Sequence, residues 1–147
     1  MNTNREILIK DIREHLSDFR FNHSVEVAKS CVELAEKYGE DTEKAYLAGI
    51  MHDVLKELPK EEMLRFFDEH NIPLTKLERN APKLWHAMAG AEYLREKYDF
   101  SEDIVSAVRY HTTGRENMTK LEKILFVADF ISLDRDYNGV EDMRERA

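Results

Sequence analysis

The chain contains little cysteine, proline or glycine for its length, and each shortage excludes a class of protein. Of its 147 residues, one is cysteine, three are proline and five are glycine. The single cysteine, Cys31, excludes a disulfide framework within the chain and fits a reducing compartment, so we expect a cytoplasmic protein. The few glycines and prolines mark turns between longer elements, and no low-complexity linker interrupts the chain.

Long apolar runs and blocks of one charge are also missing. No stretch approaches the roughly 20 apolar residues needed to span a bilayer, and residues 1–5 lead into a charged amphipathic segment, unlike a signal peptide. The formal net charge is −8, and no lysine and arginine block stands out, which disfavours a stripe that binds nucleic-acid backbone. We therefore expect neither a membrane nor a nucleic-acid partner.

Apolar residues at helical spacing dominate what is present. Hydrophobic residues make up 42% and charged residues 35% of the chain, which suits one domain with one core over residues 1–147. Because nothing alternates with period two for long enough to predict a sheet, we expect an all-α fold, a single compact helical bundle. The predicted helices cover about 5–19, 23–38, a third segment capped by Asp41 or Thr42 and carrying His52 and Asp53, then 60–70, 82–98, 102–111 and 119–131.

Histidines and aspartates recur along the chain at helices or helix ends. His52 and Asp53 are adjacent at the end of an apolar helical run, and Asp129 lies inside another such run, where a buried carboxylate needs a partner. Imidazole and carboxylate groups hold catalytic divalent metals, and two metals that share a carboxylate drive the hydrolysis of phosphate esters and anhydrides. The candidate metal ligands are His23, His52, Asp53, His86, His111 and Asp129.

Each of these residues has a simpler explanation when it is taken alone. A lone histidine at a helix end is more often a cap, a surface group or a hydrogen-bonded core residue, which is our interpretation of His15 and His70. Asp129 could pair with an arginine. The occurrence of the whole set in one small domain favours a metal centre. Its nitrogen and oxygen donors suit iron, manganese, cobalt, nickel or zinc.

Cations near these ligands are predicted to contact phosphate. Arg20 lies three residues before His23, and Lys56 lies three after Asp53, so each shares a helix face with a ligand if those helices extend far enough. The alternatives are surface salt bridges for the arginines and a solvated side chain for the lysine. We assign catalytic roles to Asp53, Lys56 and Arg20, and substrate contacts to Arg20, Lys56, Thr112, Thr113, Gly114 and Arg135.

Aromatic side chains indicate less clearly where a nucleobase would bind. An aromatic residue at helical spacing is more often part of the core, and we expect Trp85 to pack near the site without touching substrate. The candidates for stacking are Phe66, Phe67, Trp85, Tyr93, Tyr110 and Tyr137.

The order His … His-Asp … Asp resembles the HD-domain superfamily of metal-dependent phosphohydrolases. Local strings resemble the YqeK-type HD proteins more specifically, over nearly the entire chain. These strings are RFNHSVEVA (20–28), AGIMHD (48–53) with Lys56, His86 with Gly90 and Ala91, YHTTG (110–114), and MTKLEKILFVADFI (118–131) followed by Arg135. The HTTG segment and the helix that follows it are the most selective part.

The resemblance implies a symmetrical diadenosine tetraphosphatase, an enzyme with a di-iron centre that cuts diadenosine tetraphosphate into two ADP molecules. By position, one of two divalent or mixed-valence ions would be held by His23, His52, Asp53 and Asp129. A metal-bridging hydroxide would attack an inner phosphorus. His86, His111 and the bridging Asp53 would hold the other ion. Iron as the metal comes from the resemblance alone.

The chain departs from the family pattern at two places. Ala87 follows His86 where the family commonly has glycine, and residues 143–147 end the chain inside an expected helix where family members usually continue. The resemblance therefore implies either a short member or a truncated product.

Other functions stay open from the sequence. Another HD phosphohydrolase, acting on mononucleotides, guanosine tetraphosphate or cyclic nucleotides, would share the ligand set, although the HTTG segment favours the tetraphosphatase. A non-catalytic helical module held by a structural metal is a further alternative, against which the complete ligand set weighs. The apolar face of the first helix could support a homodimer or simply cap the core.

Overall fold

The computed structural model describes residues 4–147, and its regular elements within that range are all helical, which confirms the all-α prediction. The elements are α1 (Arg5–His15), α2 (Asp18–Tyr38), α3 (Thr42–Met51), α4 (Lys60–Glu69), α5 (Lys76–Arg79), η1 (Pro82–Leu84), α6 (Trp85–Tyr98), α7 (Glu102–Arg109), α8 (Lys120–Ile131) and α9 (Val140–Arg146). No helix in the described part of the chain is long and apolar enough to cross a membrane.

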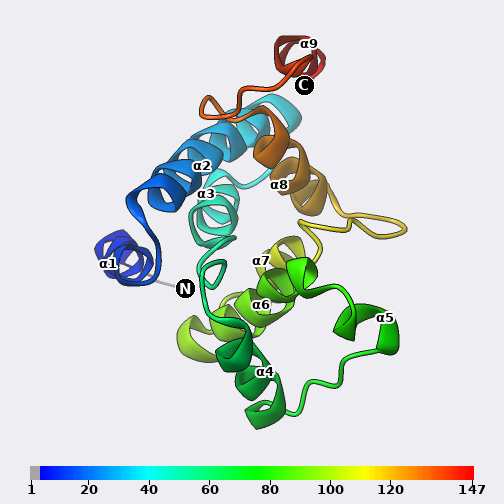
Figure 1. Ribbon diagram of the computed structural model, residues 1–147. Helices are drawn as coiled ribbons and strands as arrows, with labels where there is room; N and C mark the ends of the chain where they lie inside the picture. The colour runs from blue at the N-terminus through cyan, green and yellow to red at the C-terminus, as the bar shows by residue number, and fades with distance from the viewer. Residues whose placement is uncertain (1–3) are drawn as a thin grey trace.

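Helix α3 lies at the centre of the bundle and contacts α2, α7 and α8 (Figure 1). The long helix α2 packs along α3 and α8, whereas α4, α6 and α7 form the other half of the molecule. Buried side chains from both halves, such as Ile50, Leu94 and Leu125, belong to one core. The centre of the bundle is therefore where side chains from distant parts of the sequence can meet.

The apolar face of α1 packs on the chain's own core. Leu8 and Ile12 are fully buried, and α1 contacts both α2 and α3. The structure shows this face covering the core, and a homodimer stays a prediction.

Three predicted helix boundaries are wrong, and all three differences bear on the site. The first helix ends at His15 instead of residue 19, because Ser17 caps a new helix by accepting a hydrogen bond from the Arg20 amide. Helix α2 thus begins five residues before His23 and carries Arg20 one turn from that histidine. Helix α3 ends at Met51, so Lys56 lies in a turn after it and not on a continued helix.

Close packing of α2 on α3 depends on Gly49. A Cβ atom at this position would lie 2.7 Å from Ala28 Cα and 3.0 Å from Cys31 Sγ. Since real Cβ atoms do not approach a backbone carbon so closely, only glycine allows this helix separation. Gly49 lies one turn before His52, so the same close approach brings His52 toward the residues of α2.

Caps at other helix ends follow the sequence more closely. Gly39 ends α2 with a φ of 74°, and Asp41 accepts hydrogen bonds from the amides of Glu43 and Lys44 at the start of α3, as predicted. At α7 the predicted cap Ser101 has the extended backbone of an N-cap, but its hydroxyl donates to Asp103.

Candidate metal centre

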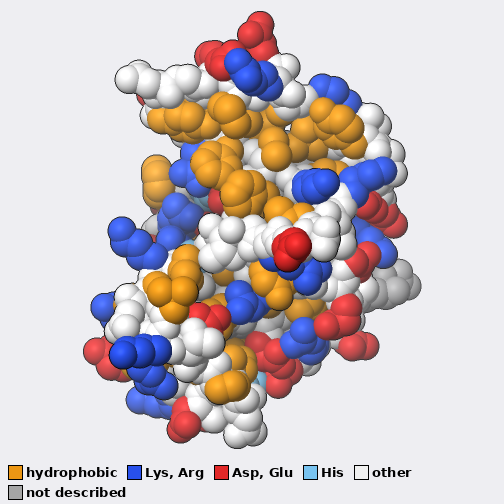
Figure 2. All heavy atoms as spheres, turned by 90° about the vertical axis from the view of Figure 1, so that its right-hand side faces the viewer, with side chains coloured by type: hydrophobic (Ala, Val, Ile, Leu, Met, Phe, Trp, Pro, Cys, Tyr) orange, Lys and Arg blue, Asp and Glu red, His pale blue; other side chains and the backbone are white. Residues whose placement is uncertain are grey.

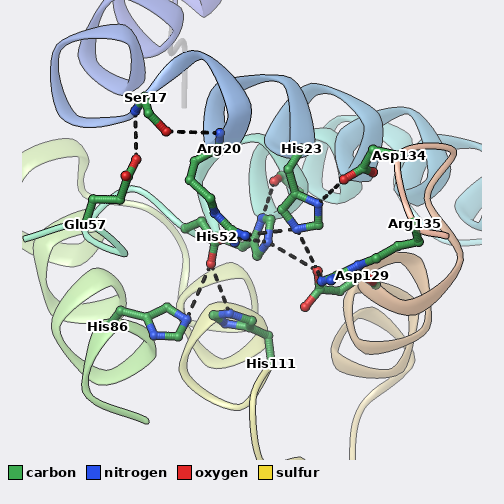
Figure 3. Close-up of polar contacts among 12 residues, drawn as sticks. Ser17, Arg20, His23, His52, Glu57, His86, His111, Asp129, Asp134 and Arg135 are labelled. Carbon is green, nitrogen blue, oxygen red and sulfur yellow. Dashed lines mark hydrogen bonds and ion pairs between the residues drawn. The ribbon is translucent and has the colours of Figure 1, made fainter. Parts of the chain in front are cut away.

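The predicted ligands lie together at the centre of the bundle, on segments that are far apart in the sequence (Figure 3). His23 comes from α2, the adjacent His52 and Asp53 from the end of α3, His86 from the first turn of α6, His111 from just after α7, and Asp129 from α8. All except Asp129 are buried, and the Asp129 side chain is partly buried. The spatial grouping expected from the sequence is therefore present.

One group of donors surrounds Asp129. His23 Nε2 lies 2.9 Å from Asp129 Oδ1, and His52 Nε2 lies 3.7 Å from the same oxygen and 3.4 Å from Asp53 Oδ2. At metal–ligand distances of about 2.1 Å, neighbouring donors around one ion are roughly 3.0–3.5 Å apart. The spacing of these imidazole and carboxylate atoms is thus close to that of ligands to one shared ion.

A second group of donors surrounds the other oxygen of Asp53. His86 Nε2 lies 3.4 Å and His111 Nε2 lies 3.5 Å from Asp53 Oδ1. Asp53 therefore turns one oxygen toward each group, and its carboxylate lies between them. This is the arrangement that a carboxylate bridging two metal ions requires.

Outer contacts fix the direction in which three of the imidazoles point. The Nδ1 atom of His52 lies 2.7 Å from the Gly49 carbonyl, and that of His111 lies 2.7 Å from the Val108 carbonyl. His23 Nδ1 lies 2.6 Å from Asp134 Oδ2. Metal-binding histidines usually donate their second N–H in this way, which leaves Nε2 free as a ligand.

His52 gives the clearest sign that the site fits a metal ion. Its Nε2 atom is buried and has no hydrogen-bond partner anywhere in residues 4–147. An unpaired buried polar atom is costly, and here it faces two carboxylates. A divalent cation would satisfy this nitrogen and both carboxylates together.

Electrostatics at the centre likewise call for positive charge. Burial alone would lower the pKa of His52, but the charges of Asp53 and Asp129 raise that pKa to about 9. Burial acts in the opposite sense on the two carboxyl groups, yet the histidines around them hold the pKa values of Asp53 and Asp129 well below the usual range. A proton on His52 thus balances charge that metal ions would balance instead.

Both predicted phosphate-binding arginines contact candidate metal ligands. The Arg20 guanidinium donates to Asp53 Oδ2, and Arg135 Nη2 donates to Asp129 Oδ1 at 2.9 Å. These are ion pairs, the alternative that the sequence left open, but they lie at the centre of the site and not on a remote surface. Each arginine is therefore placed beside a candidate metal ligand, with part of its side chain exposed.

Lys56 is half-buried in the turn that follows Asp53, where its amide donates to the Asp53 carbonyl at 2.9 Å. Burial lowers the pKa of His86, and the Lys56 charge adds to that shift. The next residue, Glu57, accepts a hydrogen bond from the Ser17 amide at the start of α2 (Figure 3), which ties this turn to the helix that carries Arg20.

The predicted donors in the HTTG segment are only partly available. The Gly114 amide donates to the Tyr110 carbonyl at 2.8 Å, and the Thr113 hydroxyl donates to the Gly114 carbonyl. The Thr112 hydroxyl is buried without a hydrogen-bond partner in the described chain. Of the two threonine hydroxyls in this segment, the one on Thr112 is free.

The histidines that we interpreted as structural are engaged elsewhere. His15 Nδ1 contacts the Asp11 carbonyl, and His70 stacks on Phe66 and lies 2.6 Å from Glu96 Oε2. Both keep the structural roles expected from the sequence.

Most of the aromatic candidates for base stacking are used in packing. Phe67 and Trp85 belong to the core, and the Trp85 indole donates to the Glu78 carbonyl. Tyr93 donates to Asp11. Tyr110 and Phe67 line cavities that contain none of the candidate ligands. Tyr137 lines a cavity of about 220 Å³ that includes the candidate ligand Asp129, together with Phe130 and Arg135.

Two residues of the site have no signal in the sequence. Asp134 is separated from His23 by 111 positions, and it lies in a turn that no periodic pattern marks. Arg144, on α9, donates to the carbonyls of Ile131, Ser132 and Arg135 in the same turn. Only the folded structure relates these residues to the ligands.

Comparison with known proteins places this geometry among hydrolases. Residues 20–134 match the HD domain family. The chain is 43% identical over 145 residues to the symmetrical bis(5'-nucleosyl)-tetraphosphatase of Bacillus subtilis (strain 168), covering 98% of this chain and 77% of that protein. It is 39% identical, with the same coverage, to the enzyme of that name from Halalkalibacterium halodurans.

A solved structure resembles the whole fold. The crystal structure from Clostridium acetobutylicum described as a predicted HD superfamily hydrolase involved in NAD metabolism has a TM-score of 0.94 and 34% sequence identity. The match covers 99% of this chain and 77% of that one.

Proposed function

The chain belongs to the HD domain family, and from that membership we propose that it cuts diadenosine tetraphosphate symmetrically into two ADP molecules at a centre of two metal ions. The observation that carries the proposal is the position of Asp53, which directs one carboxylate oxygen to each of two histidine groups. We propose iron as the metal, with manganese, cobalt, nickel and zinc as chemically suitable alternatives.

The two groups of donors divide the ligands between two ions. His23, His52 and Asp129 would hold one ion with Asp53 Oδ2, and the other would be held through Asp53 Oδ1 by His86 and His111. Bound divalent ions supply two kinds of chemistry here, since they lower the pKa of water and offset charge on phosphoryl oxygens.

The arginines would bind the phosphate chain. Each now donates to a carboxylate, Arg20 to Asp53 and Arg135 to Asp129. Once those carboxylates bind cations, their demand for a guanidinium partner falls, and the planar fork of arginine suits two phosphate oxygens. Lys56 adds a point charge on the His86 side, and the free Thr112 hydroxyl is a further donor.

The cavity beside Asp129 and Arg135 is the proposed site of one adenine base. Phe130 and Tyr137 line it and remain 46% and 38% exposed, and the Tyr137 hydroxyl donates to the Phe130 carbonyl at 2.8 Å, which fixes its ring. Hydrophobic side chains gather in the upper half of the face shown in Figure 2, with lysine and arginine side chains next to them. At the proposed site itself, two partly exposed aromatic rings beside Arg135 suit a ligand with an aromatic base and charged phosphates.

Product analysis tests this proposal. Metal-loaded protein is incubated with diadenosine tetraphosphate, and the nucleotides are separated by anion-exchange chromatography. We expect ADP as the only product. AMP with ATP as products would reject the symmetrical cut. No turnover with both metals bound would mean that the substrate is a different one among those of HD phosphohydrolases.

Two histidine variants serve as a matched pair in this assay. His86→Ala removes a donor of the second group, and we expect it to lose turnover. His70→Ala removes a histidine that stacks on Phe66 outside the site, and we expect it to retain turnover.

A further inference from the structure

Helix α9 is connected to the metal centre through Arg144. Its Nε donates to the Ile131 carbonyl at 2.8 Å, and its Nη2 donates to the carbonyls of Ser132 at 2.8 Å and Arg135 at 2.9 Å. Carbonyl groups at the end of a helix lack partners within that helix, so a guanidinium group there is a stabilising cap. Arg144 thereby fixes residues 131–135 as one defined turn after α8.

Two residues of that turn, Asp134 and Arg135, contact ligands of the first donor group. Asp134 Oδ2 lies 2.6 Å from His23 Nδ1, on the side of the ring away from Asp129 (Figure 3). Arg135 donates through Nε to the Asp129 carbonyl at 2.7 Å and through Nη2 to Asp129 Oδ1. His23 and Asp129, which contact each other at 2.9 Å, are therefore both positioned from one turn.

We infer that Arg144 and Asp134 are positioning residues for the metal ion of the first donor group, with Arg144 fixing the turn and Asp134 fixing His23. The inference rests on the proposed function, because it requires a metal ion at His23, His52 and Asp129. A carboxylate behind a ligating histidine fixes its tautomer and ring orientation and raises its basicity. Arg144 acts one step further away, by holding that carboxylate in place.

We call the contacts from Arg144 through Asp134 to His23 the relay, and they reach only one of the two donor groups. In the second group, the His111 ring is fixed by the Val108 carbonyl of α7. The turn at residues 131–135 takes no part in that contact. Loss of Arg144 or Asp134 should therefore weaken the binding of one metal ion and leave the binding of the other unchanged. General destabilisation of the fold would not distinguish the two ions in this way.

The test is a titration with Mn²⁺, followed by electron paramagnetic resonance of the free ion, on the full chain, three single variants and one double variant. Removing such an outer partner typically costs 10- to 100-fold in metal affinity. For Asp134→Asn we expect a loss in that range at one site, and for Arg144→Gln a loss on the order of tenfold at the same site. The melting temperature of each variant is measured alongside.

Arg146→Gln is the matched control. Arg146 lies on the same helix, but its side chain is 76% exposed and pairs with Asp142 on the surface, whereas the Arg144 side chain is 20% exposed. We expect this variant to bind both ions as the unmodified chain does. In the double variant of Arg144 and Asp134, we expect a loss smaller than the two single losses combined, because the effect of Arg144 on His23 passes through Asp134.

The results that would overturn the inference differ from those that would overturn the proposed function. If Arg144→Gln lowers the melting temperature but leaves both affinities unchanged, or weakens both sites equally, Arg144 is purely structural. If the losses at Arg144 and Asp134 simply add, the relay through Asp134 is wrong. If the unmodified chain binds fewer than two Mn²⁺ ions, the proposed function fails and takes the inference with it.

Discussion

Replacing Gly49 by alanine should force α2 and α3 apart. The added Cβ would lie 2.7 Å from Ala28 Cα, whereas carbon atoms in favourable contact are about 3.5–4.0 Å apart. The shortfall is thus roughly 0.8–1.3 Å. The obstacle is backbone, which cannot rotate away as a flexible side chain could, so the helices themselves must separate.

The cost of this substitution can be estimated against its benefit. Overpacking of this kind costs about 1–3 kcal/mol, and the rigid obstacle places Gly49→Ala near the upper end. Alanine regains about 1 kcal/mol of helix propensity over glycine. The net loss is about 2 kcal/mol, which for a chain of this size lowers the melting temperature by roughly 4–8 °C.

Gly90→Ala is the internal control for that experiment. Gly90 lies inside α6, and a Cβ there would meet nothing closer than Val108 Cγ1 at 3.8 Å, an ordinary contact. We expect this variant to gain up to about 1 kcal/mol from helix propensity. Thermal unfolding followed by circular dichroism compares the two.

The same displacement should weaken metal binding. His52 lies one turn after Gly49 and faces His23 on α2, so a separation of about 1 Å at the helix contact disturbs donor spacing at the first group. We expect Gly49→Ala to lose Mn²⁺ affinity and Gly90→Ala to keep it. A Gly49→Ala protein at least as stable as the unmodified chain would refute the packing argument.

Further predictions concern Asp53 as the bridging ligand, the pH dependence of metal binding and of stability, and the proposed adenine site. Asp53→Ala should lose metal and turnover, and retention of both metals with normal turnover would contradict its assignment. The pKa of His52 is raised to about 9, so below that pH a metal ion must displace a proton from its ring. Mn²⁺ affinity should therefore rise up to tenfold per pH unit up to about pH 9 and then level off. An affinity that does not change with pH would contradict this. Asp11 accepts hydrogen bonds from two tyrosines that hold its pKa below the usual range despite burial, so Asp11→Asn should cost about 2 kcal/mol at pH 7. A lowered pKa stabilises the fold fully above the unfolded value of about 4. That difference should therefore shrink as pH falls below about 4 and through the lowered pKa of the folded chain, as urea unfolding at several pH values would show. Tyr137→Ala should raise KM for diadenosine tetraphosphate and leave hydrolysis of inorganic tetraphosphate unchanged, and equal losses on both would exclude base stacking.

The helical fold and the ligand set could be predicted because both have local signatures. Helical spacing of apolar residues marks most elements, and Gly39 and Asp41 mark helix ends through their own backbone and side-chain chemistry. The start of α2 was missed because apolar spacing continues from α1 to Phe19 and conceals the cap at Ser17. A local pattern cannot decide between a continued helix and a new one when both satisfy the same spacing.

The supports of the site could not be predicted, because they depend on contacts between distant segments. Asp134 and Arg144 acquire their roles only when the turn after α8 is folded against α2 and α9. Gly49 lies in an apolar run where propensity alone would favour alanine, and its necessity comes from Ala28 on another helix. The loss of the Gly114 amide as a donor likewise follows from the turn it makes with Tyr110.

Electron paramagnetic resonance of the Mn²⁺-loaded chain is the measurement that shows whether Asp53 bridges two metal ions. Two ions joined by one carboxylate are close enough for their spins to couple. We expect two Mn²⁺ ions per chain with an exchange-coupled spectrum, and loss of that coupling in Asp53→Ala. One ion per chain, or two ions with the spectrum of isolated Mn²⁺, would contradict it.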